Sequence, residues 1–172
     1  MKYTKYALLR RAYALLEDVT PLKYDCGKIC GGACCKPDSV NRETQGGMTL
    51  LPYEDTLIGG CDEFTIKNTQ DSKVLLCSGS CERIFRPFAC RIFPFYARID
   101  KDTESISLRI DPRSVNVCPI ALKQKGTRHS VYFRRNVIRA VRLLMKDEDF
   151  KREFIRTSEF CDSLYEFYYK LV

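Results

Sequence analysis

The sequence contains a single histidine, His129, among its 172 residues. Catalytic zinc sites usually combine histidine ligands with an open water position, and one histidine cannot supply such a set. A cysteine–histidine nucleophile pair would need His129 to face a thiol, and we expect instead a solvent-facing or capping histidine. The sequence therefore offers no histidine-based catalytic centre, and it leaves open whether the chain is an enzyme.

The chain also lacks a long apolar run. Charges at Lys2, Lys5, Arg10 and Arg11 interrupt its first sixteen residues, which does not fit a secretory signal peptide. No segment is long and apolar enough to span a membrane. We therefore expect a cytoplasmic protein without a membrane partner, in a compartment where thiols are kept reduced.

No long linker, internal repeat or low-complexity run divides the sequence. Its apolar content of 45% is enough for one domain with a core of its own. We predict a single α+β cysteine-cluster domain over residues 1–172. A small, irregular, metal-nucleated core with short β-hairpins, at about 22–120, would be flanked by an N-terminal helix and a helical C-terminal cap at about 128–172.

Hydrophobic periodicity predicts the individual elements. The predicted helices cover residues 2–17, 52–58, 130–146 and 149–156, followed by a last helix with Ser158 as its N-cap. Its predicted apolar face consists of Phe160, Leu164, Phe167 and Leu171. The predicted strands are 48–51, a hairpin of 64–66 with 74–76, and a second hairpin of 95–99 with 105–110.

Cysteine is the residue that the sequence has in quantity, with ten in all. Four thiols fall within residues 26–35, beside glycines that let the backbone fold tightly, and a second group follows between residues 77 and 118. In a reducing compartment, clustered cysteines are more often metal ligands than disulfides. We predict eight metal ligands: Cys26, Cys30, Cys34, Cys35, Cys77, Cys81, Cys90 and Cys118.

Eight thiols suit two tetrahedral zinc sites or one binuclear site with a shared thiolate, and iron–sulfur clusters use the same ligands. The spacing does not decide between the metals, and we expect zinc before iron or an iron–sulfur cluster. The formal charge of +7 counts every cysteine as neutral. Eight thiolates would lower it by eight and two divalent zinc ions would raise it by four, which leaves about +3.

Four further residues near these motifs have open roles. Cys61 follows two glycines and is either a spare ligand or a plain buried thiol. Cys161 lies on a predicted helix, where we expect core packing. Arg86 and Arg91 flank Cys90, and we expect their charges to stabilise ionised sulfurs and to donate hydrogen bonds to them. Surface salt bridges are the alternative.

The predicted helix at 130–146 carries a basic stripe of Arg135, Arg139, Arg142 and Lys146. A nucleic-acid backbone could bind there. The alternative is the solvated face of an amphipathic helix, which we favour, so we do not expect a nucleic-acid partner.

Two motifs in combination resemble a known family. They are Cys26…Cys30-Gly31…Cys34-Cys35 and Cys81…Arg86-Pro87…Cys90-Arg91…Phe93-Pro94. They resemble the YkgJ-like proteins, which are described as zinc- or iron-chelating cysteine-cluster proteins and are sometimes labelled iron–sulfur oxidoreductases. The resemblance covers residues 26–118 and implies the same eight cysteines as ligands. Relative to the family, the chain has one extra residue between Cys30 and the cysteine doublet and one residue fewer between Cys81 and Arg86. These departures leave open whether Cys77 or Cys81 takes the family's place in each half of the site.

Three function hypotheses follow. The first is a metal-binding protein that holds zinc or iron through eight cysteines, with a structural or metal-handling role. The second is an iron–sulfur oxidoreductase or modifying enzyme. The third is a nucleic-acid-binding module that uses the basic helix. Metal ions are the expected partners, and the sequence names no protein partner.

Overall fold

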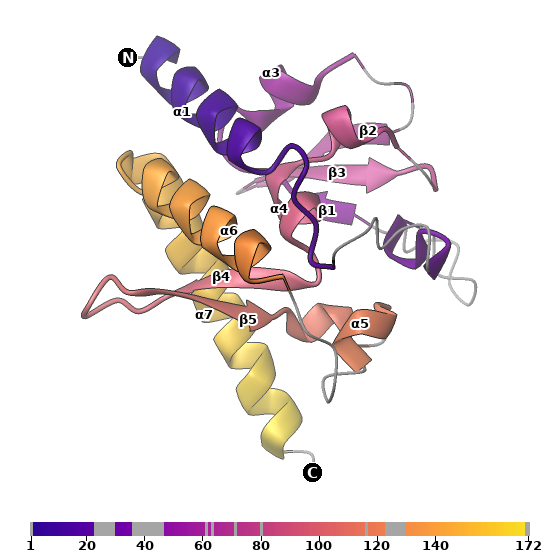
Figure 1. Ribbon diagram of the computed structural model, residues 1–172, viewed down its shortest axis with the longest axis vertical. Coiled ribbons are helices and arrows are strands. Elements are labelled where there is room, and N and C mark those ends of the chain that lie inside the picture. Colours follow the sequence, from indigo (N-terminus) through magenta and orange to yellow (C-terminus); the bar gives the residue numbers. More distant parts are fainter. Residues whose placement is uncertain are drawn as a thin grey trace.

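The protein has an α+β fold, seen in a computed structural model that describes residues 2–22, 30–35, 47–60, 62, 64–70, 72–79, 81–115, 117–122 and 130–170 (Figure 1). Two small antiparallel sheets lie between an N-terminal helix and two C-terminal helices. The fold class is therefore the predicted one. In the described part of the chain, no helix has the length and apolar character needed to cross a bilayer.

The first sheet has three strands in the order β1-β3-β2: β1 (Gly47–Thr49), β2 (Phe64–Asn68) and β3 (Lys73–Cys77). Pairing of Phe64 with Cys77 in an antiparallel register confirms the predicted hairpin. Pairing of β1 with β3 adds a strand whose partner the sequence did not indicate. At Gly47 a Cβ atom would lie 2.8 Å from the Leu75 carbonyl oxygen, so only glycine allows this close approach.

The second sheet confirms the other predicted hairpin. Its strands β4 (Phe95–Ile99) and β5 (Ile106–Ile110) pair antiparallel. The Asp100 carboxylate accepts hydrogen bonds from the Asp102 and Thr103 backbone amides, which closes the turn between them.

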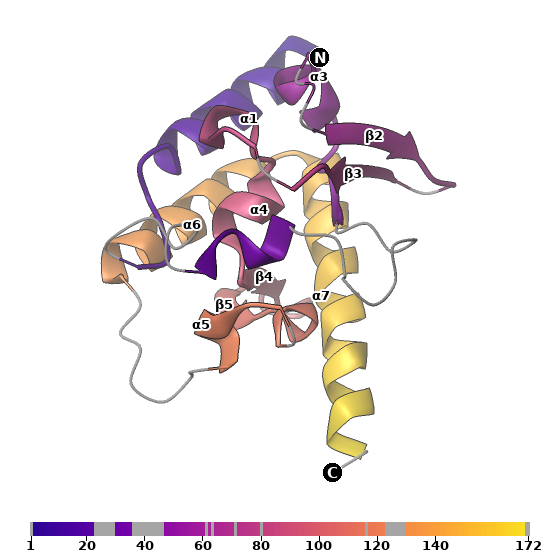
Figure 2. The ribbon, with the colours of Figure 1, turned by 90° about the vertical axis from the view of Figure 1, so that its right-hand side faces the viewer.

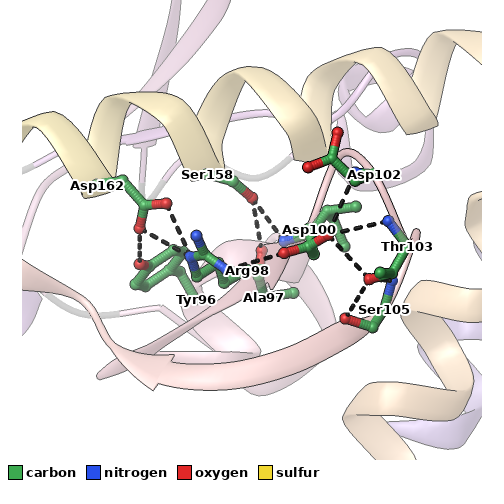
Figure 3. Close-up of polar contacts among 10 residues, drawn as sticks. Tyr96, Ala97, Arg98, Asp100, Asp102, Thr103, Ser105, Ser158 and Asp162 are labelled. Atoms are coloured by element: carbon green, nitrogen blue, oxygen red, sulfur yellow. Dashed lines mark hydrogen bonds and ion pairs between the residues drawn. The ribbon is translucent and has the colours of Figure 1, made fainter.

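The C-terminal helix α7 (Glu148–Lys170) is one continuous helix that packs against β4 (Figure 3). The prediction of two helices with Ser158 as an N-cap is wrong. The Ser158 hydroxyl is buried in mid-helix, where it donates to the Phe154 carbonyl and accepts from the Ile99 amide at 2.9 Å. Arg98 reaches Asp162 at 2.8 Å beside it. The hydroxyl therefore joins helix to sheet and does not end a helix.

The predicted apolar face of this last helix is wrong at its two phenylalanines, whereas Leu164 is half-buried and Leu171 lies outside the described residues. Phe160 and Phe167 are 50% and 59% exposed. The buried side instead includes Phe150, Phe154 and Cys161, so the expectation of core packing for Cys161 is confirmed. The C-terminal part of α7 extends beyond the sheet that it packs against (Figure 2). Apolar spacing along such a helix does not by itself show which side is buried.

Helices α1 (Lys2–Leu15) and α6 (Val131–Leu144) pack against each other and against the core, close to their predicted bounds. Leu9 and Ala12 of the first, and Val137 and Leu144 of the second, are fully buried. The Ser130 hydroxyl accepts from the Phe133 amide at 3.3 Å and caps α6. The short helix α3 (Glu54–Ile58) begins two residues later than predicted.

Candidate metal centre

Three segments carry six of the predicted ligands that the structure describes, and Cys118 lies apart from them. The first is Cys30–Cys35, which ends in the 3-10 helix η1 (Ala33–Cys35). Gly31 and Gly32 have φ of +61° and +70°, so they turn the chain as few other residues can. The segment lies between α4 (Phe88–Ile92) and α5 (Pro119–Leu122) in Figure 2.

The other two segments are the end of β3 and the stretch that follows it. Cys77 is the last residue of β3, and Cys81 precedes the 3-10 helix η2 (Arg83–Phe85). Pro87 separates η2 from α4, which carries Cys90. Proline disrupts a helix interior, so η2 and α4 are separate elements.

Six cysteines interact with one another, and we call them the cysteine cluster. The Cys34 and Cys35 sulfurs are 3.9 Å apart. Cys35 also has a side-chain hydrogen bond with Cys77, and electrostatic interactions link Cys90 to Cys35 and Cys81. The members of the cysteine cluster are Cys30, Cys34, Cys35, Cys77, Cys81 and Cys90.

The cluster distributes protons unevenly among its thiols. Hydrogen bonds from Cys34 and Cys77, together with the charge of Arg86, hold the pKa of Cys35 well below its usual range. The hydrogen bond to Cys35 and burial raise the pKa of Cys34 and that of Cys77. Burial, with the neighbouring Cys35 and Cys81, raises the pKa of Cys90. The surroundings therefore favour ionisation of Cys35 over that of Cys34, Cys77 and Cys90.

The sulfur separations can be compared with a metal site. Two thiolates bound to one tetrahedral zinc at about 2.3 Å each lie about 3.8 Å apart. The distance of 3.9 Å between the Cys34 and Cys35 sulfurs is close to this sulfur–sulfur distance. Across the residues that the structure describes, however, no group of three histidine, cysteine, aspartate or glutamate side chains is placed so as to hold a metal ion.

The remaining cysteines are placed differently. Cys118 is buried in the turn before α5, and none of the sulfur interactions of the cluster includes it. Cys26 and Cys61 lie outside the described residues, as does His129. Each cysteine that the structure describes is a free thiol. The structure thus brings together six of the eight predicted ligands.

The two arginines beside Cys90 have different roles. Arg86 lies near the cluster, where its charge lowers the pKa of Cys35 and opposes the raised pKa of Cys90, which agrees with the predicted effect of its charge. Its guanidinium donates a hydrogen bond to the Cys81 carbonyl at 3.5 Å. Arg91 differs from the prediction. It is 5% exposed, and its guanidinium donates to the carbonyls of three residues, Arg83, Ile84 and Arg86, at 2.8–3.0 Å. Arg91 thus stabilises the loop between Cys81 and Cys90, whereas Arg86 is the arginine whose charge acts on the sulfurs.

Glu54 is a supporting residue that sequence reasoning missed. Its fully buried carboxylate accepts hydrogen bonds from the Tyr13 hydroxyl, the Leu51 amide and the Phe88 amide. Phe88 begins α4, so Glu54 ties the helix of Cys90 to α1 and α3. Arg91 stacks 4.3 Å from the centre of the Tyr13 ring and adds to this connection. A glutamate in a short helix gives no signal of burial by itself.

Comparison of the chain with protein-family profiles, with curated proteins and with solved structures gave no match.

Proposed function

We propose that this protein binds zinc or iron through its cysteines and serves a structural or metal-handling role. The proposal includes the eight predicted ligands, of which Cys26 and Cys118 would complete the six members of the cysteine cluster. Membership of the YkgJ-like family is part of the same proposal and is supported by the cysteine and Arg-Pro motifs. Arg86 would balance thiolate charge, and Arg91 and Glu54 would hold the loop and helix that carry Cys81 and Cys90.

The observation that carries the proposal is the 3.9 Å separation of the Cys34 and Cys35 sulfurs. At this separation both sulfurs can bind one metal ion. A third thiol, Cys77, approaches the same Cys35 sulfur from another segment. Cys35 thus contacts a thiol on either side and lies near the Arg86 guanidinium, and thiolates are the ligands that soft metals prefer.

An iron–sulfur centre is the second candidate, because it uses the same ligands. The two candidates differ in their spectra. Closed zinc–thiolate sites give no visible absorbance, whereas iron with sulfide gives a broad visible band.

The test is metal analysis with an absorption spectrum on protein purified without air. We expect about two zinc ions per chain for two four-thiolate sites. Cys35→Ser should lose metal and melt at lower temperature, because a structural metal contributes directly to folding. The matched control is Cys161→Ala, which removes a buried thiol on α7, away from the cluster. It should keep the full metal content.

Each outcome is informative. Iron with sulfide in the wild type would replace the first candidate with the second. Full metal content and unchanged melting in Cys35→Ser would show that the cluster is not the site. Equal metal loss in both variants would mean that unfolding, and not a lost ligand, releases the metal.

A further inference from the structure

The outer side of α6 carries a set of charges that the cysteine cluster does not use. Four exposed arginines lie on this side, and we call them the arginine face: Arg134, Arg135, Arg139 and Arg142. The helix contains no aspartate or glutamate. Within the part of the chain that the structure describes, none of the four forms an ion pair. Their guanidinium donors are therefore accessible to a ligand from solution.

The orientation of this face is fixed by the core. Phe133, Val137 and Ala140 are fully buried on the inner side of α6, so the helix cannot rotate without exposing them. A shallow surface hollow runs along the outer side. Its lining consists of Val131, Arg134, Arg135, Ile138, Arg139 and Arg142.

We propose that the arginine face binds the phosphate backbone of a nucleic acid. Arg134 and Arg142 are eight residues apart, which is about 12 Å along a helix. Four charges over this length approach the density of one DNA strand, about one per 3.4 Å. Arginine also suits phosphate because its planar fork donates two parallel hydrogen bonds. Tyr132, 67% exposed in the first turn of α6, supplies a ring on which a base can stack.

Two other anionic partners fit less well. A helix that lies on a membrane buries its apolar side in lipid, but the apolar side of α6 is already in the protein core. A protein partner would have to present clustered aspartate and glutamate, which are depleted in protein–protein interfaces, whereas a nucleic acid carries a phosphate at every nucleotide. A polyanion of regular charge spacing matches the arginine face better than either.

The neighbouring helix adds charge of the same sign. α1 packs against α6 and has exposed Arg10 and Arg11, again with no aspartate or glutamate in the helix. Repulsion between nearby cations is relieved when a polyanion binds. This proposal does not depend on the cysteine cluster, so either can fail without the other.

The test is fluorescence anisotropy of the full chain with labelled oligonucleotides of about 20 nucleotides, single-stranded and duplex. Four phosphate contacts predict a slope of log K against log salt near −3, and hence a loss of roughly 100-fold in affinity between 50 and 200 mM salt. Arg135→Gln, Arg139→Gln and Arg142→Gln together should reduce the slope to about −1. The matched control changes three exposed cations elsewhere to glutamine, Lys67, Arg109 and Arg152. It has the same net charge and should keep the wild-type slope.

Circular dichroism of both triple variants verifies that each is folded. A preference for single strand over duplex would support stacking on Tyr132, and Tyr132→Ala should then weaken single-strand binding selectively. The proposal is overturned if the wild type does not bind, or if the control loses affinity as much as the α6 variant. It is also overturned if vesicles of acidic phospholipid, or poly-glutamate, bind as tightly as the oligonucleotide at equal salt.

Discussion

Replacing Glu54 with glutamine should destabilise the protein through one buried hydrogen-bond network. One Glu54 oxygen accepts from both Tyr13 and Phe88, and the other accepts from the Leu51 amide at 2.7 Å. Glutamine retains one oxygen, so its amide group must face either the Leu51 donor or the other two donors. At least one buried donor then lacks an acceptor, which costs about 1–3 kcal/mol. For a chain of this length, the melting temperature should fall by about 2–12 °C.

The effect should also depend on pH. Burial raises the pKa of Glu54 above its ordinary value of 4.5. At a pH between the ordinary pKa of the unfolded chain and the raised pKa of the folded state, the folded state holds a proton that the unfolded chain has lost. The free energy of unfolding therefore falls as pH rises through this range. Glutamine does not titrate. The stability lost by Glu54→Gln should therefore be largest near pH 4 and smaller at pH 7.

Urea unfolding of both proteins across this pH range measures the difference. Tyr13→Phe and the double variant complete a cycle, whose coupling energy should be about 0.5–3 kcal/mol because the two side chains are in contact. Asp55→Asn, which changes a neighbouring, half-buried carboxylate on α3, is the control. A melting temperature unchanged by Glu54→Gln, or a destabilisation that grows from pH 4 to pH 7, would refute this reasoning.

Three further perturbations test other contacts. Ser158→Ala removes the acceptor of the buried Ile99 amide and should cost about 1–3 kcal/mol, seen as a lower urea midpoint at unchanged m-value. Arg91→Lys cannot reach three carbonyls with one ammonium group and should cost about 2–3 kcal/mol in the same assay. Excess chelator added to the metal-loaded protein should lower its melting temperature in calorimetry, because the cluster joins separate segments.

Matched changes separate these effects from general damage. Ser163→Ala, at an exposed position of α7, and Arg109→Lys, on the exposed side of β5, should stay within about 0.5 kcal/mol of the wild type. Equal stability of Ser158→Ala and Ser163→Ala would mean that the Ile99 contact contributes nothing. A melting temperature that does not respond to chelator would count against a structural metal.

The sequence predicted the elements whose formation depends on local pattern. Alternation and polar turns located both hairpins, and the 3.6-residue period located α1 and α6. The continuity of α7 could not be predicted in this way. Serine is a good N-cap, and only the position of Ile99 opposite Ser158 shows that this hydroxyl bonds to a strand.

The candidate site, too, could be predicted from the sequence only in part. Close spacing in sequence correctly placed Cys30, Cys34 and Cys35 together, and the expected hairpin correctly brought Cys77 to them. The inward orientation of Arg91 depends on carbonyls that converge only after η2 and α4 have folded. Charge and proximity in sequence are insufficient to predict such contacts.

The pairing of α1 with α6 has a consequence for synthesis on the ribosome. The buried side of α1, with Leu9 and Tyr13, packs against a helix that ends at Leu144. About 130 residues separate the ends of the two helices, which at 5–20 residues per second means a delay of roughly 6–26 s. During this interval α1 has been synthesised but its packing partner has not. The native core therefore closes late in translation, and the nascent chain is exposed to aggregation or to capture by chaperones until it does.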